Sequence, residues 1–202
     1  GCNKPDTYLC QVCFTRLDSQ DKIEIEKNKY LNKIITATSY KDPFVRELIK
    51  KFKYNYIKEL AKPLSQLLIK SMTQCWIPGI PHNNTIVVPI PLYGTRMRKR
   101  GFNQAELIAK EIANHFNLCL ETNILIRKIS TEPQANIKDD KKRKANIKGV
   151  FKINPSSLNR IRDGNIILVD DVATTNATLS EAAKILKKSG AKEVWGTVVA
   201  KG

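Results

Sequence analysis

The sequence predicts an α/β fold in which a parallel sheet is flanked by helices. The first observation is a βαβ pattern: the apolar runs NIILVDD (165–171) and EVWGTVVA (193–200) lie on either side of an amphipathic segment. The second is a β-branched run that ends in prolines, TIVVPIP (85–91), with another helical pattern soon after it. The third is composition, because 202 residues with 42% hydrophobic side chains can fill the core of one ordinary domain. Apolar strands separated by helices favour a parallel sheet covered on both faces.

Helical periodicity justifies the elements around these strands. Apolar residues recur at helical intervals between Pro43 and Met72, which predicts two amphipathic helices that cover the body. Another helix is expected to begin near Asn103, a good N-cap that Glu106 follows three residues later. The segment from about Leu120 to Phe151 is mostly polar; within it, ILIRK fits a strand and the remainder receives no assignment.

The helix between the last two strands is expected to run from Thr178 to Ser189 and to stop at Gly190. Thr178 is predicted to be its N-cap, with Glu181 completing a Thr-x-x-Glu capping box. Residues 173–178 then form a loop of free backbone amides, and free amides at the start of a helix bind phosphate.

Two adjacent acids, Asp170 and Asp171, stand where the first of these strands ends. In open parallel sheets, ligands bind beyond the carboxyl ends of the strands. The carboxylates can accept hydrogen bonds from a sugar diol or help to hold hydrated magnesium, while the hydroxyls of Thr174, Thr175 and Thr178 can donate to a phosphate. The pattern indicates a site for a ribose 5-phosphate. The alternative is an acidic turn followed by a capped helix.

Other phosphate motifs and membrane signals are missing from the sequence. It contains neither G-x-x-x-x-G-K-[ST] nor G-x-G-x-x-G, which excludes a P-loop and a dinucleotide fingerprint. No window approaches about 18 uninterrupted apolar residues, and no basic segment followed by an apolar run opens the chain. We therefore expect a cytoplasmic protein without a membrane span.

The formal net charge of +16 invites a polyanionic partner, although solvated lysines are the commonest fate of such residues. Basic residues cluster in RMRKRG (96–101) and in KDDKKRKANIK (138–148). The first cluster leads into a helix, and guanidinium forks suit the oxygens of a diphosphate. The alternatives are a solvated face or a nucleic-acid patch. Its candidate ligands are Arg96, Arg98, Lys99 and Arg100.

The N-terminal segment GCNKPDTYLCQVC suggests a zinc site. The C-x₂-C spacing of Cys10 and Cys13 lets two thiolates of one turn bind a single tetrahedral zinc, and Cys2 could supply a third ligand. A structural zinc takes four ligands, so we expect the fourth thiolate just before the first residue. The alternative is that these cysteines are free. Cys75 and Cys119 are expected to be packing residues.

The segments VPIPLYGTRMRKRGFNQAELIAKEIA, RKISTEPQANIKDDKKRKANIKGVF, IILVDDVATTNAT and VVAKG together resemble the ComF family, which is associated with DNA uptake in natural competence. RGFNQ is the most specific part. The resemblance implies a type I phosphoribosyltransferase-like domain behind a four-cysteine zinc finger. On this basis we divide the chain into a Cys-rich zinc-finger-like segment, 1–36, and a phosphoribosyltransferase-like domain, 37–202.

The resemblance also implies a ligand and its binding residues. It implies that Asp170 and Asp171 meet the ribose hydroxyls of magnesium-bound phosphoribosyl pyrophosphate, and that a pyrophosphate site lies near the loop after Ile90. The usual family loop has glycine where this chain has Asn176, whose side chain could reshape the phosphate pocket. The 5-phosphate loop comprises Val172, Ala173, Thr174, Thr175, Asn176, Ala177 and Thr178. The pyrophosphate candidates include Arg100, Asn103 and Gln104, with Gln134, Arg143 and Asn146 on a flap.

Three functions follow from these observations. The first is a ComF-like protein that binds phosphoribosyl pyrophosphate and supports the uptake or handling of single-stranded DNA. The second is an active phosphoribosyltransferase, although neither His82 nor His115 stands out as a base for an acceptor. The third is a non-catalytic protein that uses the zinc head to dock onto other DNA-uptake proteins. Fold alone does not decide between them.

Overall fold

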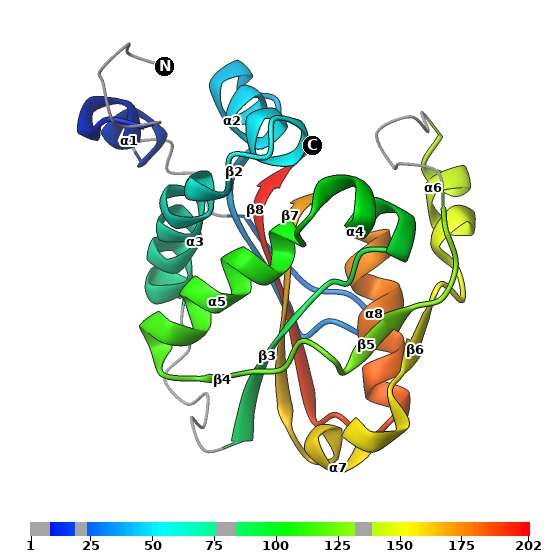
Figure 1. Cartoon of the computed structure of the whole chain (residues 1–202). Coiled ribbons are helices and arrows are strands. Elements are labelled where there is room, and N and C mark those ends of the chain that lie inside the picture. Colours follow the sequence, from blue (N-terminus) through cyan, green and yellow to red (C-terminus); the bar gives the residue numbers. More distant parts are fainter. Residues whose placement is uncertain (1–8, 19–23, 76–83, 132–138) are drawn as a thin grey trace.

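The computed structural model describes residues 9–18, 24–75, 84–131 and 139–202 (Figure 1). Among these residues, six strands form the main sheet in the order β1-β2-β8-β7-β3-β4. All neighbouring strands are parallel except β1, which pairs antiparallel with β2 at one edge. The strands of this sheet are β1 (Glu24–Glu26), β2 (Lys33–Ser39), β3 (Thr85–Pro89), β4 (Cys119–Leu120), β7 (Asn165–Ala173) and β8 (Glu193–Lys201).

The remaining elements surround this sheet. A short antiparallel pair consists of β5 (Leu125–Arg127) and β6 (Phe151–Ile153). The helices are α1 (Gln11–Asp18), α2 (Pro43–Tyr54), α3 (Ala61–Cys75), α4 (Gly94–Arg100), α5 (Gln104–Phe116), α6 (Asp140–Ile147), α7 (Leu158–Ile161) and α8 (Ala177–Lys188). This arrangement confirms the predicted α/β fold with a parallel sheet between helices.

The two faces of the sheet are both buried, which explains why its central strands read as continuous apolar runs. Successive strand residues point to opposite faces, so Ile166 and Ile167 of β7 belong to different clusters. Helices α2, α3 and α5 cover one face, while α8 and the β5–β6 pair cover the other.

The central strands β3 and β7 are neighbours that lead to opposite sides of the sheet. After β3 the chain passes through α4 into α5 on one face, and after β7 it enters α8 on the other. Their carboxyl ends therefore open into a crevice, the usual place for a ligand in an open parallel sheet.

Several elements agree with the sequence-based predictions. The pattern between residues 43 and 72 corresponds to α2 and α3. The Asp42 side chain caps α2 by accepting hydrogen bonds from the amides of Phe44 and Val45, at 2.8 and 3.0 Å. Asn103 caps α5, as expected, by accepting a hydrogen bond from the amide of Ala105. The βαβ unit is β7–α8–β8, and α8 is followed by Gly190 with a φ of 98°.

Two local predictions are wrong. The residue that caps α8 is Asn176 rather than Thr178, and the carboxylate of Glu181 accepts from the Gly149 amide instead of closing a capping box. The arginine cluster at 96–101, predicted to be a loop leading into the next helix, instead forms a helix of its own, α4, which ends at Gly101 with a φ of 75°.

The N-terminal part of the chain contributes to the sheet. The sequence-based boundary at residue 36 falls inside β2, and both β1 and β2 hydrogen-bond into the six-stranded sheet. The segment 33–39, KIITATS, gave no strand prediction, but five of the six β8 residues that pair with it across the ladder are buried. Parallel pairing with an apolar strand therefore overrides its weak local pattern.

Candidate functional site

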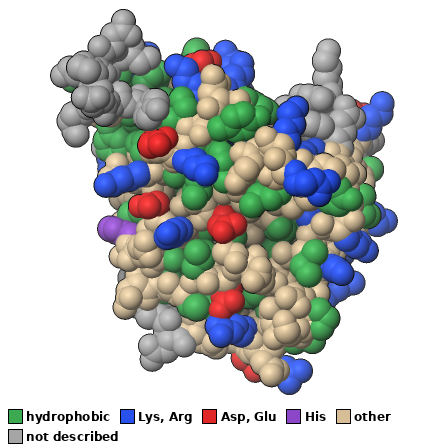
Figure 2. All heavy atoms as spheres, viewed as in Figure 1, with side chains coloured by type: hydrophobic (Ala, Val, Ile, Leu, Met, Phe, Trp, Pro, Cys, Tyr) green, Lys and Arg blue, Asp and Glu red, His purple; other side chains and the backbone are tan. Residues whose placement is uncertain are grey.

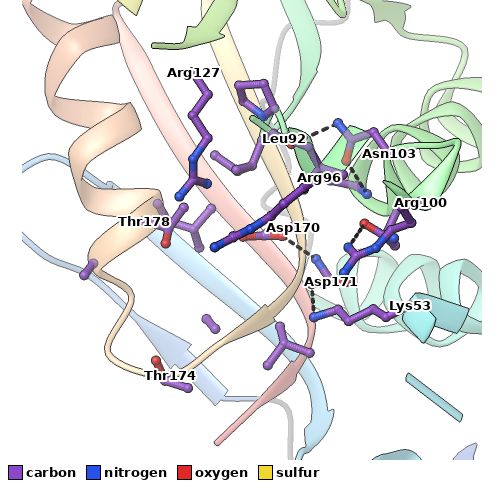
Figure 3. A pocket seen from close by; sticks show the side chains of 18 of the residues that line it. Lys53, Leu92, Arg96, Arg100, Asn103, Arg127, Asp170, Asp171, Thr174 and Thr178 are labelled. Atoms are coloured by element: carbon purple, nitrogen blue, oxygen red, sulfur yellow. Dashed lines mark hydrogen bonds and ion pairs between the residues drawn. The ribbon is translucent and has the colours of Figure 1, made fainter. Parts of the chain in front are cut away.

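A pocket of about 540 Å³ lies at the carboxyl ends of β3 and β7, within the size range of small-molecule sites (Figure 3). Three groups of residues line it: the acids at the end of β7, the loop that leads into α8, and basic side chains from α2, α4 and β5. The sequence-predicted phosphate loop and most of the predicted arginines thus share one cavity.

The acid pair lies at the centre of this pocket. Asp171 is buried, and its carboxylate forms an ion pair with the Lys53 ammonium at 2.9 Å. Burial, together with the negative charge of Asp171, raises the pKa of Asp170 from 3.8 to about 7, despite the opposing charge of Lys53. A cation or a hydrogen-bond donor from a ligand would therefore be favoured beside Asp170.

Lys53 was missed by the sequence reasoning. It follows Phe52 on α2 and reaches across to the end of β7 (Figure 3). Burial acts to lower the pKa of Lys53, but the carboxylates of Asp171 and Asp170 outweigh it and leave the pKa above 10.5. Lys53 is therefore a charged partner of the acid pair. The sequence around it does not distinguish it from the many other lysines of the chain.

The loop between β7 and α8 carries the predicted phosphate ligands. Its residues Thr174 and Thr178 lie on the side of Asp170 away from α4 in Figure 3. The first amides of a helix have no intrahelical acceptor, so the start of α8 supplies donors to this end of the pocket. The Thr175 hydroxyl is buried and has no hydrogen-bond partner among the described residues.

Asn176 occupies the left-handed region with a φ of 56°. Its side-chain nitrogen donates a hydrogen bond of 2.6 Å to Glu26 of β1. The side chain is therefore attached to the edge strand, although the residue still lines the pocket.

Three arginines line the opposite end of the pocket. Arg96 and Arg100 come from α4 and Arg127 from β5, and Figure 3 shows Arg96 and Arg127 directed towards the region of Asp170. The backbone oxygen of Thr131 accepts from Arg96, and its hydroxyl accepts from Arg127, so one residue fixes both guanidinium groups. Arg127 was seen in the sequence only as part of a strand.

Burial and repulsion between neighbouring arginines disfavour the charged forms of Arg96 and Arg127. Burial and the neighbouring Arg96 lower the pKa of Arg127 to about 10, with Asp170 opposing the shift. Burial and Arg100 similarly lower the pKa of Arg96. Two cations that disfavour each other in this way would gain from an anion placed between them.

The other predicted pyrophosphate ligands have different environments. Asn103 lines the pocket, but its side chain caps α5 and donates to the Ile90 oxygen at 3.0 Å. Gln104 is buried and accepts from Arg100 at 2.6 Å. Lys99 lines the pocket and is exposed, whereas Arg98 is exposed on α4 and does not line it.

Unpaired polar atoms concentrate at this pocket. Within the described residues, six buried side-chain nitrogen or oxygen atoms lack a hydrogen-bond partner, and four of these belong to pocket-lining residues. Buried polar groups are normally paired, so this concentration indicates a place where a polar ligand completes the hydrogen bonds. The four atoms are Gln104 Nε2, Arg127 Nε, Thr175 Oγ1 and Asn176 Oδ1.

The predicted flap and zinc ligands are only partly described. Gln134 and Cys2 lie outside the described residues, as does the side chain of Arg143. Asn146 lies on α6 and does not line the pocket. Cys10 is buried just before α1 and Cys13 lies within it; the described ranges contain no cluster of three metal-ligating side chains. The zinc site stays a prediction.

No helix in the described part of the chain is both long enough and apolar enough to span a membrane.

Comparison with known proteins identifies the family of the chain. Residues 99–202 match the phosphoribosyl transferase domain family. Competence protein F of Haemophilus influenzae is 30% identical over 167 residues, 82% of this chain and 72% of that protein. DNA utilization protein YhgH of Escherichia coli (strain K12) is 27% identical over 173 residues, covering 85% and 74%. Competence protein ComFC of Bacillus subtilis is 29% identical over 184 residues, covering 90% and 65%. The chain therefore belongs to the phosphoribosyltransferase family, among its ComF-type competence proteins.

Proposed function

We propose that the pocket binds phosphoribosyl pyrophosphate together with magnesium. The observation that carries the proposal is the order of the three groups within one cavity: helix-start loop, acid pair, then arginines. A phosphate, a ribose diol and a diphosphate require these three chemistries in this order.

Each end of the pocket would take one part of the ligand. The 5-phosphate would accept hydrogen bonds from the loop 174–178 and the start of α8, while the ribose hydroxyls would donate to Asp170 and Asp171. The pyrophosphate would lie against Arg96 and Arg127. The unpaired polar atoms of this pocket support such a polar occupant.

Magnesium suits the acid pair because it prefers carboxylate oxygens and phosphate oxygens. Asp170, whose pKa is raised mainly by burial and by its acidic neighbour, would be stabilised as a carboxylate by this cation. When bound, magnesium neutralises the diphosphate as a leaving group. The protein's own part is to fix the phosphate and the ribose, which aims the anomeric carbon at an acceptor.

The test is calorimetric titration of magnesium phosphoribosyl pyrophosphate into the unmodified protein and an Asp170→Asn/Asp171→Asn variant. We expect a loss of affinity of about 100-fold or more, since two charge-assisted contacts are removed. Asp163→Asn is the matched control, because Asp163 is an exposed acid just before β7, at the other end of that strand. Equal affinities for all three proteins would rule out binding at the acid pair.

A second proposed function is the handling of single-stranded DNA. It is supported by the names of the relatives and by the exposure of Arg98 and Lys99 on α4, beside the pocket mouth. Figure 2 shows basic side chains over α4 and the neighbouring side of the molecule, whereas acids are interspersed elsewhere on this face. A basic surface of this kind binds phosphates by releasing counterions.

Fluorescence anisotropy with a labelled single-stranded oligonucleotide tests this function. We expect Arg98→Ala/Lys99→Ala to weaken binding and to lower the slope of log affinity against log salt by roughly 1.4, about 0.7 for each lost phosphate contact. Lys188→Ala/Lys192→Ala, at two exposed lysines near the amino end of β8, is the control. Salt-independent binding, or equal losses in both variants, would contradict the proposal.

A further inference from the structure

A non-glycine residue holds a left-handed conformation inside the phosphate-binding loop. Asn176 has a φ of 56° and a ψ of 12°, and only 9% of it is exposed. Asparagine tolerates this region better than other non-glycine residues, but it still favours right-handed and extended backbone. The conformation therefore depends on contacts that hold the residue in place.

The principal contact comes from β1, the strand at one edge of the main sheet. The Asn176 side-chain nitrogen donates to Glu26 Oε2 at 2.6 Å, and the other carboxylate oxygen of Glu26 pairs with Lys201 at the end of β8. Two residues further on, the Asn28 amide donates to the hydroxyl of Ser180 at 2.8 Å. The segment 26–28 thus attaches to the start of α8 at two points.

The amide of Asn176 is held through its nitrogen. Its oxygen, Oδ1, is buried and has no hydrogen-bond partner among the described residues. Without Glu26, the Asn176 side chain would make no hydrogen bond among the described residues. The charge of Glu26 is meanwhile balanced by Lys201, so the carboxylate can lie near the loop without repelling a phosphate.

We propose that Glu26 is a positioning residue for the phosphate-binding loop: it holds Asn176 left-handed and so fixes the first amides of α8. The ligand in this inference is that of the proposed function, on which it rests. Glu26 does not touch the ligand. It performs through a contact across the sheet what a glycine at position 176 would do through its intrinsic freedom of backbone torsion.

The inference predicts that the need for Glu26 disappears in an Asn176→Gly background. Calorimetry would compare four proteins, unmodified, Glu26→Ala, Asn176→Gly and the double variant, with ribose 5-phosphate and with magnesium phosphoribosyl pyrophosphate. We expect Glu26→Ala to weaken both ligands about tenfold relative to the unmodified protein, and the affinities of Asn176→Gly serve as the reference for the double variant. In the double variant, the additional loss from Glu26→Ala should be less than about twofold.

Two controls separate positioning from general damage. Glu26→Gln removes the charge of the ion pair but keeps an oxygen that can accept the hydrogen bond from Asn176, and it should change the affinities less than about threefold. Inorganic pyrophosphate, which has no 5-phosphate, should bind Glu26→Ala as it binds the unmodified protein. A tenfold loss from Glu26→Ala in both backgrounds, or no loss in either, would overturn the inference.

Failure of the proposed function has a different signature. If the unmodified protein binds neither sugar phosphate, the ligand assignment fails. Denaturant unfolding of the same four proteins then tests whether Glu26 holds Asn176 in place. We then expect Glu26→Ala and Asn176→Gly to be coupled by about fivefold in the unfolding equilibrium constant. Additive effects on unfolding would overturn the role of Glu26 in holding Asn176.

Discussion

The two ends of the pocket are built in different ways. The loop end comes from one stretch of chain, residues 170–178, which runs from the last part of β7 into α8. The other end is assembled from Lys53 of α2, Arg96 and Arg100 of α4, and Arg127 of β5. The residues of the first end are therefore consecutive in the sequence, whereas those of the second are brought together only by the packing of the helices and the β5–β6 pair.

The ends also differ in electrostatics. The loop end offers hydroxyls and helix amides, whose donors need no counter-ion. At the basic end, burial and mutual repulsion lower the pKa of both Arg96 and Arg127. We therefore expect substitutions at the basic end to have a larger effect than substitutions of the loop hydroxyls on a ligand that carries a diphosphate.

Apart from loss of the acid pair, the largest expected effect comes from Arg96→Met/Arg127→Met. Loss of both guanidinium groups should weaken magnesium phosphoribosyl pyrophosphate by about 100-fold, or about 2.7 kcal/mol. Ribose 5-phosphate lacks the diphosphate and should bind within about twofold of the unmodified protein. Calorimetry with both ligands measures the separation of the two ends.

Arg160→Met is the matched control, because Arg160 is an exposed arginine paired with Glu121 on another part of the surface. It should leave both affinities unchanged. If the Arg96→Met/Arg127→Met variant loses ribose 5-phosphate to the same extent, the two ends do not act separately.

The next effect concerns the connection between the ends, the ion pair of Lys53 with Asp171. Lys53→Met leaves the buried Asp171 without its partner and should lower the free energy of unfolding by about 2 kcal/mol. This is less than the loss expected for a fully buried pair, because Lys53 retains some contact with water. Lys53→Met/Asp171→Asn removes both charges and should recover most of this loss. Denaturant unfolding of the double-mutant cycle measures the coupling; additive losses would show that the pair is not coupled.

The same division explains what the sequence could predict. The acid pair was identifiable because an apolar strand runs directly into two carboxylates, and threonines follow before a helical pattern. Lys53 has no comparable local context, and Arg127 sits in a short strand whose pairing partner is 24 or more residues away. Asn103 was correctly predicted to cap α5, and its side chain is largely engaged in that role.

The error at α8 has a physical reason as well. The sequence pattern Thr-x-x-Glu suggested a cap at Thr178, but Asn176 adopts the left-handed conformation and the helix starts immediately after it. Glu181 is then drawn to the Gly149 amide, 32 positions away in sequence. Tertiary contacts from the β1 edge and from the turn after α6 thus set a boundary that the local motif placed elsewhere.

Asp170 gives a smaller, pH-dependent effect. Its pKa in the folded protein is about 7, mainly because of burial and then the charge of Asp171, against 3.8 in an unfolded chain. The folded state therefore binds more protons than the unfolded state between pH 4 and 7, and stability from this group falls as pH rises through that window. Relative to Asp170→Asn, the unmodified protein should lose unfolding free energy as the pH rises from 4 to 8. A parallel pH dependence in the two proteins would contradict this.

The smallest expected effect on stability comes from Thr175→Val, at the loop end. The Thr175 hydroxyl is buried without a partner among the described residues, so replacing it with a methyl group of similar shape should leave the unfolding free energy within about 1 kcal/mol or raise it. The affinity for ribose 5-phosphate should nevertheless fall about fivefold, since a donor to the phosphate is lost. Thr197→Val is the control: that hydroxyl is also buried and unpaired in the described structure, but it lies in β8 outside the pocket lining. It should match Thr175→Val in its effect on the unfolding free energy and leave the affinity for ribose 5-phosphate unchanged. Both hydroxyls are unpaired in the protein alone, so only contact with a ligand can distinguish the two substitutions.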